Sequence, residues 1–420
     1  MRALLALAMR SAWNRRFVLA LVVLSIALST FLLLGVERIR ADVRENFSSS
    51  LSGTDLVVGA RTGSVQLLLY SVFRIGNATN NIQWSSVQAL ARHRAVAWVV
   101  PISLGDTHRG FSVVGTSAAY FEHFRHGAGQ RLELAGGRRF EAVFDAVLGA
   151  EVAERLRYGV GDRLVLSHGD GAFAANEHAD KPFTVVGILR RTGTPVDRSV
   201  HISLEAMEAL HLDWAAGSPL PGAAVSADQV SRYDLTPRNV TAALVGLKNR
   251  AAVFAVQRYV AEFEAEPLMA VLPGVALDEL WDVVGAGERA LAALSALVAA
   301  VSFFGLIAVV LAGLNERRRE LAILRAVGAG PRQVLGLLAL EGALVTIAGV
   351  AAGWLASVLA VLLLGGVFEA RFGIALQLRP PVAREAWLLA GLLAAGWLAS
   401  LVPGYRGYRL SLADGLSPRI

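Results

Sequence analysis

The 420-residue sequence has no cysteine and only two lysines, Lys181 and Lys248. Without cysteine there is no disulfide, no thiolate nucleophile and no zinc site with sulfur ligands. A phosphate-binding P-loop needs a lysine after a glycine-rich turn, and neither ADKPF around Lys181 nor GLKNR around Lys248 provides one. The hydrolase patterns G-x-S-x-G and H-E-x-x-H are also missing. The sequence therefore predicts a chain that is not an enzyme and does not itself hydrolyse a nucleotide.

Charged residues are scarce, at 18%, whereas hydrophobic residues reach 55% and the mean hydropathy is +0.51. This balance is typical of a protein that is partly embedded in lipid. The net charge of +6 comes almost wholly from arginine. These arginines flank apolar runs, as they do at the cytoplasmic ends of membrane helices, so we expect no nucleic-acid partner.

Four apolar runs are suited to crossing a membrane: residues 17–36, 290–314, 334–367 and 386–402. About 20 such residues are needed to span the hydrocarbon core. A signal peptide is the alternative for the first run, because three arginines precede it. An uncleaved helix is favoured, since the run exceeds the ~7–15 residues of a signal core and no cleavage site follows it.

The stretch 37–289 contains no spanning run and predicts an extracytoplasmic domain inserted between the first and second membrane helices. Its short strand-like and helical patterns do not alternate regularly, which favours an α+β fold. The expected strands are 55–59, 97–104, 110–115, 163–167 and 183–189, and the expected helices are 149–158, 204–210 and 251–264. The two ends of the domain, residues 37–51 and 277–289, are expected to continue the neighbouring membrane helices as a stalk.

Arginines near the helix ends predict the orientation. They cluster before the first run, in the connection 315–333 and in the tail 403–420. Both termini are therefore expected in the cytoplasm, with residues 1–16 as an interfacial helix. The short outer loop 368–385 carries three further arginines (Arg371, Arg379 and Arg384), which weakens this asymmetry.

The connection between the second and third runs carries the most information. The segment from Glu316 to Ala326 (ERRRELAILRA) predicts a short helix with charged and apolar sides, and Gly328, Gly330 and Pro331 predict its end. Such a helix, held between two membrane spans, suits the docking of a cytosolic partner. From the residues alone, a solvated positively charged loop is an equal alternative.

This segment resembles the coupling helix of the MacB/LolC/FtsX family of ABC permeases. The shared pattern is Glu-Arg-x-x-Glu-x-x-x-x-Arg-x-x-Gly, and VLGAEVAERLRYGVGDRLVL (147–166) and FTVVGILRRTGTPVDRSVHISLEAM (183–207) look like core segments of the family's periplasmic domain. The resemblance implies that a separate ATPase subunit with ATP and Mg²⁺ contacts the coupling helix. The expected coupling residues are Glu316, Arg317, Glu320, Ile323, Arg325 and Gly328.

Two features of the third run concern the packing of the bundle. Gly349 and Gly353 form a G-x-x-x-G pattern that allows close helix contact, although a generic small-residue surface is an equal reading. Glu341 is the only acid in the run. Because it lies near the cytoplasmic end, a structural role is favoured over a proton relay.

All eight histidines fall in the extracytoplasmic stretch. His123 and His126 have the spacing to meet on one helical face as a metal site, since imidazole binds zinc or copper well. Arg125 between them opposes a cation, and histidine avoids lipid in any case. The favoured interpretation is no metal site, with His123 and His126 as the only candidates.

The sequence thus predicts a permease subunit of an ABC complex in the bacterial inner membrane, acting as a homodimer or paired with a second permease. ATP hydrolysis by the partner would move the exported domain, an action called mechanotransmission, for export, extraction or trafficking of a substrate. The alternatives are an FtsX-like regulator of a periplasmic partner such as a cell-wall hydrolase, and a receptor that handles metal or lipid.

Overall fold

The structure is a computed structural model that describes residues 16–50, 52–168, 178–215, 218–219, 225–316, 323, 325–372 and 378–409. The chain divides into two compact units. The membrane unit comprises residues 1–42, 284–371 and 375–420, and the exported unit comprises 43–283 with 372–374. The expected interfacial helix 1–16 lies outside the described residues apart from Arg16, and so does most of the expected tail.

Four long helices are apolar enough to cross a membrane. They are α2 (Arg16–Ser49), α9 (Pro273–Glu316), α11 (Pro331–Phe372) and α12 (Ala383–Arg409). The prediction of four transmembrane helices with a domain between the first and second is confirmed. Each helix is longer than the apolar run that predicted it, because hydropathy marks the part in lipid and not the point where helical hydrogen bonding stops.

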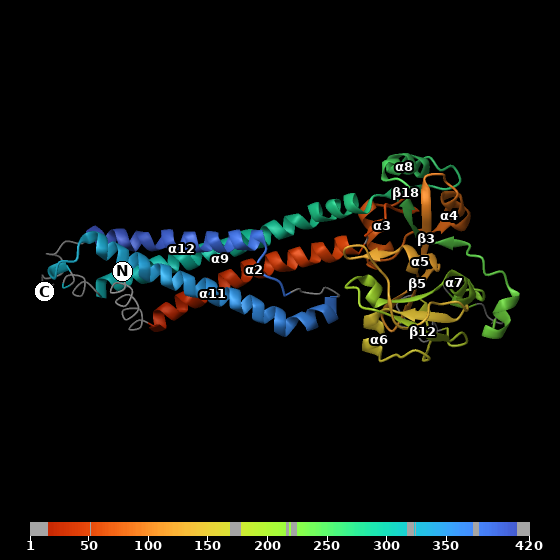
Figure 1. Ribbon diagram of the computed structural model, residues 1–420, viewed down its shortest axis with the longest axis horizontal. Coiled ribbons are helices and arrows are strands. Elements are labelled where there is room, and N and C mark those ends of the chain that lie inside the picture. Colours follow the sequence, from red (N-terminus) through yellow and green to blue (C-terminus); the bar gives the residue numbers. More distant parts are fainter. Residues whose placement is uncertain are drawn as a thin grey trace. The chain divides into compact units, whose positions relative to one another are not determined.

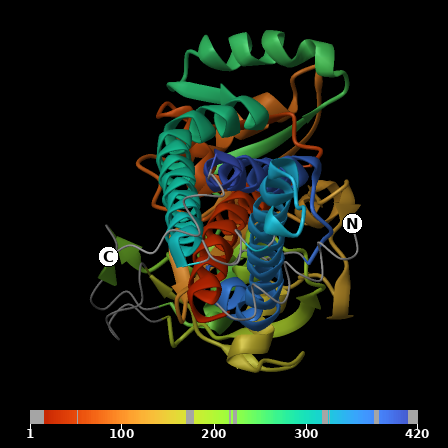
Figure 2. The ribbon, with the colours of Figure 1, turned by 90° about the vertical axis from the view of Figure 1, so that its left-hand side faces the viewer.

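The helices of the membrane unit pack around a small apolar core. Leu19 and Ile26 of α2, Leu306 of α9, and Val334 and Leu338 of α11 are buried in it. Figure 2 shows α2, α9, α11 and α12 running alongside one another. Many other leucines of these helices are more than half exposed, as lipid-facing side chains are.

The exported unit is built on a mixed sheet whose strands run in the order β10-β12-β9-β13-β5-β3-β17-β1-β18. β12 pairs with β9 and β13 pairs with β5 in parallel, and the other pairs along this path are antiparallel. Its strands are β1 (Leu56–Ala60), β3 (Val96–Ser103), β4 (Asp106–His108), β5 (Phe111–Thr116), β8 (Leu134–Gly137), β9 (Asp145–Leu148), β10 (Arg163–Leu164), β11 (Ser167–His168), β12 (Phe183–Leu189), β13 (Ser199–Ser203), β17 (Ala242–Leu247) and β18 (Leu268–Val271). Short two-stranded ribbons complete the described strands: β2 (Ile82–Gln83) with β16 (Asn239–Val240), β6 (Arg125–His126) with β7 (Gln130–Arg131), and β14 (Trp214–Ala215) with β15 (Ser218–Pro219).

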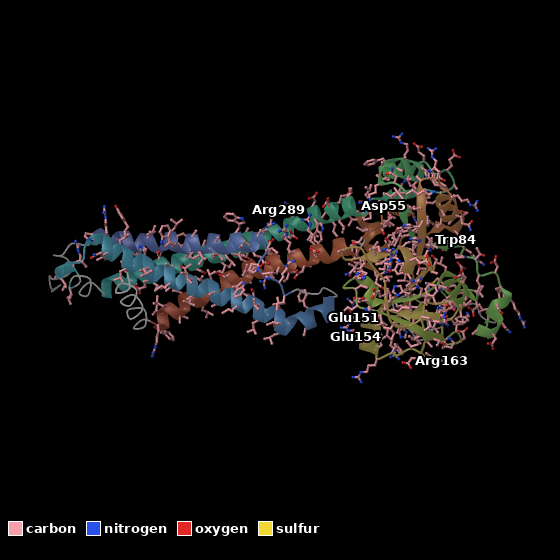
Figure 3. The ribbon with its side chains drawn as sticks, viewed as in Figure 1. Asp55, Trp84, Glu151, Glu154, Arg163 and Arg289 are labelled. Atoms are coloured by element: carbon pink, nitrogen blue, oxygen red, sulfur yellow. The ribbon has the colours of Figure 1, made fainter. Side chains whose placement is uncertain are left out.

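Helices cover this sheet in two groups (Figure 1). Around β1, β3, β17 and β18 lie α3 (Ser64–Ser71), α4 (Trp84–Ala91), α5 (Ala119–His123) and α8 (Val253–Ala261), and around β9, β12 and β13 lie α6 (Ala150–Leu156) and α7 (Leu204–Leu210). Figure 3 labels Glu151 and Glu154 of α6 and Arg163 of β10 near the second group, and Trp84 of α4 and Asp55, just before β1, near the first. Short 3₁₀ turns lie at Pro195–Arg198, Ala227–Arg232 and Arg250–Ala252.

The mixed strands and helices agree with the predicted α+β class, and the helix 204–210 has the predicted limits. The predicted strand 163–167 is instead two short strands, β10 and β11, on different partners. Strands β9, β13 and β17 were not predicted. Every residue of β9 and β13 is buried, so neither strand shows the alternation that marks a half-exposed strand.

Candidate functional site

The predicted coupling segment joins α9 to α11. Glu316 is the last residue of α9, and Arg317 and Glu320 lie outside the described residues. Ile323 is 53% exposed and Arg325 is half-buried.

The end of this segment is a helix-terminating turn. The Val327 amide donates to the Ile323 carbonyl at 3.0 Å, and the Gly328 amide donates to the Arg325 carbonyl at 3.1 Å. Gly328 has φ +104°, a conformation that residues with a side chain rarely adopt. The chain then enters α11 at Pro331, where proline suits a first helical turn. The described turn therefore leads from the end of the coupling segment directly into α11.

Gly349 and Gly353 of α11 face α2. A Cβ atom on Gly349 would lie 2.7 Å from the Ile26 Cβ, and one on Gly353 would lie 2.6 Å from the Thr30 Cβ and would also strike the Ala27 carbonyl oxygen. The two backbones approach as closely as they do because neither glycine has a side chain.

Two turns nearer its N-terminus, α11 packs on α12 in the same way. A Cβ on Gly342 would collide with Ser400, and one on Gly396 would collide with Thr346. The Ser400 hydroxyl also donates to the Ala339 carbonyl at 3.2 Å. Glu341, one residue from Gly342, is 3% exposed and so sits inside the bundle.

Helices α2 and α9 contact each other through polar groups inside their apolar stretches. The Ser302 hydroxyl lies 2.8 Å from that of Ser25 and 2.9 Å from that of Ser29. Nearer the exported side, the Arg40 Nε lies 2.8 Å from the Glu288 carboxylate. Residue numbers rise along α2 as they fall along α9, so the two helices run antiparallel.

Ion pairs connect α2 to the beginning of α12 and the loop before it. Arg38 pairs with Glu385 at 3.4 Å, Arg379 with Asp42 at 3.1 Å and Arg384 with Glu37 at 3.2 Å. Arg38 and Glu385 are 4% and 0% exposed. Two of the arginines that weakened the charge asymmetry are thus partners of acids on α2. The complementary charges of 37–42 and 379–385 are the sequence signal for these pairs.

Within the exported unit, the ends of α2 and α9 pack on the domain and on each other. Phe47 of α2 stacks on Phe73 with ring centroids 4.2 Å apart, and it meets the Trp281 ring of α9 edge-on at 5.8 Å. Arg44 lies over the same tryptophan and pairs with Asp278 at 3.5 Å. These contacts, together with the antiparallel pairing of β1 with β18, hold the entry and exit of the domain side by side.

The histidines predicted as metal candidates do not share a helical face, because α5 ends at His123 and His126 lies in β6. The His123 ring stacks on Trp98 at 5.0 Å, and His126 is buried in β6. Among the described residues, the one group of three or more potential ligands that come together is Asp106, His168, His178 and His211, whose ligand atoms all lie within 4.8 Å of one another. Sequence reasoning missed this group because its members are far apart along the chain.

The local electrostatics of this group favour a charged Asp106 carboxylate and a neutral His178 imidazole. Burial alone would raise the pKa of Asp106, but hydrogen bonds from His168 and His211 bring it down to about 2. Burial lowers the pKa of His178 to about 4. For His211, burial acts in the same direction, but the hydrogen bond with Asp106 outweighs it and the pKa is raised.

Comparisons with known proteins agree with this architecture. The family model "MacB-like periplasmic core domain" matches residues 18–263, and the model "FtsX-like permease C-terminal" matches residues 292–412. A comparison with curated proteins finds no match.

Among solved structures, the periplasmic region of MacB from Actinobacillus actinomycetemcomitans aligns at 12% identity, with a TM-score of 0.33. The alignment covers 56% of this chain and 96% of the other. The extracellular domain of the noncanonic ABC-type transporter YknZ from Gram-positive bacteria aligns at 12% identity, with a TM-score of 0.29. It covers 52% and 98% of the two chains.

A membrane unit of four helices, with an exported domain between the first two, defines a multi-pass inner-membrane protein with a large extracytoplasmic part. The core-domain model covers more than half of the chain and the FtsX-like model follows it in order. The chain belongs to the MacB/FtsX-type family of ABC transporter permeases.

Proposed function

We propose that this chain is a mechanotransmitting permease subunit that converts ATP hydrolysis by a separate ATPase chain into movement of its exported domain. The observation that carries the proposal is the continuity of α2 and α9. Each runs as one helix from its apolar stretch into the exported unit, where it leads to β1 or begins after β18. A helix transmits displacement along its axis because its backbone hydrogen bonds are all internal.

The contacts between α2 and α9 make them act as a pair. Ser25 and Ser302 join them in the apolar stretch, Arg40 and Glu288 join them further along, and Phe47 meets Trp281 within the exported unit. A change in the packing of the bundle would therefore reach the β1–β18 pair through both helices together. The close glycine contacts of α11 with α2 and with α12 are two packed helix contacts that can be rearranged.

The cytosolic part of the proposal places the ATPase on the connection between α9 and α11. ATP and Mg²⁺ would bind in that partner, and Glu316, Arg317, Glu320, Ile323 and Arg325 of this chain would contact it, with Gly328 ending the helix. Both termini would lie in the cytoplasm, and two permease subunits would work together.

Charge reversal in the coupling segment tests the contact. Glu320→Arg and Arg325→Glu are each expected to reduce transport-linked stimulation of ATPase activity about tenfold or more, because each turns an attraction into a repulsion at a desolvated contact. Arg406→Glu, on the exposed surface of α12, is the matched control and is expected to behave like the wild type. Normal coupling in both coupling variants would remove the assignment of these residues.

The partner itself is tested by purifying the tagged full-length chain from its native membranes in a mild detergent and identifying the bound proteins by mass spectrometry. An ATPase with a P-loop at about equal amount supports the proposal. Its absence, also after trapping with a non-hydrolysable nucleotide, would overturn it. The exported domain would then be studied as a receptor or as the regulator of a periplasmic partner.

A further inference from the structure

Four polar side chains converge at one edge of the exported sheet. Asp106 begins β4 and His168 ends β11, and these two residues are direct partners in the antiparallel β4–β11 pair. His178 follows in the chain and is tied to the same edge by its amide, which donates to the Leu166 carbonyl at 2.9 Å. His211 caps the C-terminus of α7. The group lies wholly within the exported unit.

The donor atoms have the spacing of ligands around one metal ion. The Asp106 Oδ1 lies 2.9 Å from the His168 Nδ1 and 3.4 Å from the His211 Nε2, and the two histidine nitrogens are 3.2 Å apart. Ligands of a tetrahedral Zn²⁺ at ~2.0–2.1 Å are about 3.3 Å from one another. Three of the four donors therefore already match that geometry, and the fourth lies within 4.8 Å of them.

The environment of the fourth donor, His178, is not explained by a purely structural hydrogen-bond network. It is 1% exposed, and within the described part of the chain neither of its ring nitrogens has a hydrogen-bond partner. The Asp106 Oδ2 is likewise buried without a partner. A buried imidazole that makes no hydrogen bond loses the solvation of two polar atoms, and a metal bond would compensate for that loss.

Surrounding contacts orient the donors as they do in known metal sites. The His211 Nδ1 lies 2.8 Å from the Met207 carbonyl, which leaves the Nε2 to bind a cation. The Lys181 ammonium is fully buried and bonds the Asp213 carboxylate at 2.5 Å, which holds the segment after His178 against the end of α7. The Trp214 ring packs on His178 with centroids 4.5 Å apart.

The group is accessible from solvent on one side. The side chains of His168 and His211 are 31% and 29% exposed, and Asp106 and His168 line a cavity of about 360 Å³. A cation can therefore enter without unfolding of the domain.

We propose that Asp106, His168, His178 and His211 form a binding site for a divalent transition metal, with Zn²⁺ as the best match. Three imidazole nitrogens and one carboxylate oxygen suit zinc better than Mg²⁺ or Ca²⁺, which prefer oxygen ligands. The bound ion would join the β4–β11 edge, the segment at His178 and the end of α7. This site is independent of the coupling to an ATPase.

Zinc titration of the full-length chain tests the proposal. The protein is purified in detergent without a histidine tag, stripped with a chelator and titrated with Zn²⁺ in a calorimeter. One ion per chain is expected. His168→Ala and His211→Ala are each expected to weaken binding about a hundredfold, since even second-shell changes cost about 10–100-fold. His123→Ala is the matched control and is expected to bind like the wild type.

Co²⁺ absorption, read together with circular dichroism, distinguishes the loss of a metal ligand from misfolding of the domain. Wild-type protein is expected to give the intense visible bands of a tetrahedral Co²⁺ centre. His178→Gln keeps a polar side chain of similar size, and it is expected to lose these bands while the circular dichroism spectrum stays unchanged. Stoichiometric binding that survives in His168→Ala and His211→Ala, or a wild type that binds neither metal, would overturn the proposal.

Discussion

The membrane unit and the exported unit are each stabilised by internal packing, but of opposite kinds. In the exported unit, large side chains such as Tyr120, Phe121 and Phe183 are fully or almost fully buried beside a sheet. In the membrane unit the closest contacts are made where side chains are missing, at Gly342, Gly349, Gly353 and Gly396, with a few polar pairs added. The difference follows from the solvent: burying an apolar side chain away from lipid gains little, so close backbone packing and polar contacts decide.

Arg38 and Glu385 are expected to give the largest effect, because they are the most buried ion pair among the described residues of the membrane unit. Glu385→Gln leaves the guanidinium buried without its counter-charge and is expected to lower stability by about 3–5 kcal/mol. Thermal unfolding of the detergent-purified chain measures the loss.

The exposed pair nearby is the matched comparison. Arg384 is 63% exposed, so Arg384→Gln is expected to cost no more than about 1 kcal/mol. The double variant Arg38→Glu with Glu385→Arg is expected to recover part of the stability lost in Glu385→Gln. Equal melting temperatures for Glu385→Gln and Arg384→Gln would show that burial does not set the strength of these pairs.

Gly353 allows a test of whether close backbone packing at glycines stabilises the helix bundle. Gly353→Leu places a side chain against the Ala27 carbonyl and Thr30 of α2, and overpacking of this kind costs about 1–3 kcal/mol. Gly365→Leu is the control on the same helix, since a Cβ there meets nothing within 4 Å. The same melting experiment applies. A Gly353→Leu variant as stable as Gly365→Leu would contradict the close contact of α11 with α2.

Lowering the pH is expected to destabilise the exported unit more than the membrane unit, because every histidine of the chain lies in the exported stretch. This effect is expected to be smaller than those of the substitutions above. His201 is fully buried beside Tyr120, and burial lowers its pKa to about 3, with the nearby Arg74 charge acting in the same direction. The unfolded chain binds a proton below about pH 6.5, whereas the folded domain does not until about pH 3. The contribution of His201 is therefore complete above about pH 6.5 and declines as the pH falls toward 3.

Hydrogen exchange measured by mass spectrometry at pH 7 and pH 5.5, corrected for intrinsic rates, follows this effect in each unit. Peptides from β9 and β13 are expected to lose protection at the lower pH, and His201→Gln is expected to reduce that loss. An unchanged loss in His201→Gln would assign the acid sensitivity to other groups of the domain.

Prediction from sequence succeeded where the signal is local. A run such as 17–36 predicts its own helix because membrane insertion depends on composition over about 20 residues. The apolar pattern ends at residue 36, but α2 continues to Ser49, within the segment 37–51 that was expected to extend the helix as a stalk. The partners of its charged residues, which lie on α9, α12 and the loop before α12, were not predicted. In the exported unit, the buried strands β9 and β13 gave no alternating pattern to detect.

By itself, the sequence determined the four membrane helices and the place of the exported domain between the first two, because each depends on residues close together in the chain. Only the tertiary structure decided which groups meet. Arg38 and Glu385 are 347 residues apart, and the metal candidates Asp106 and His211 come from different elements of the fold. Such pairings depend on strand register and helix contact, which no local pattern specifies.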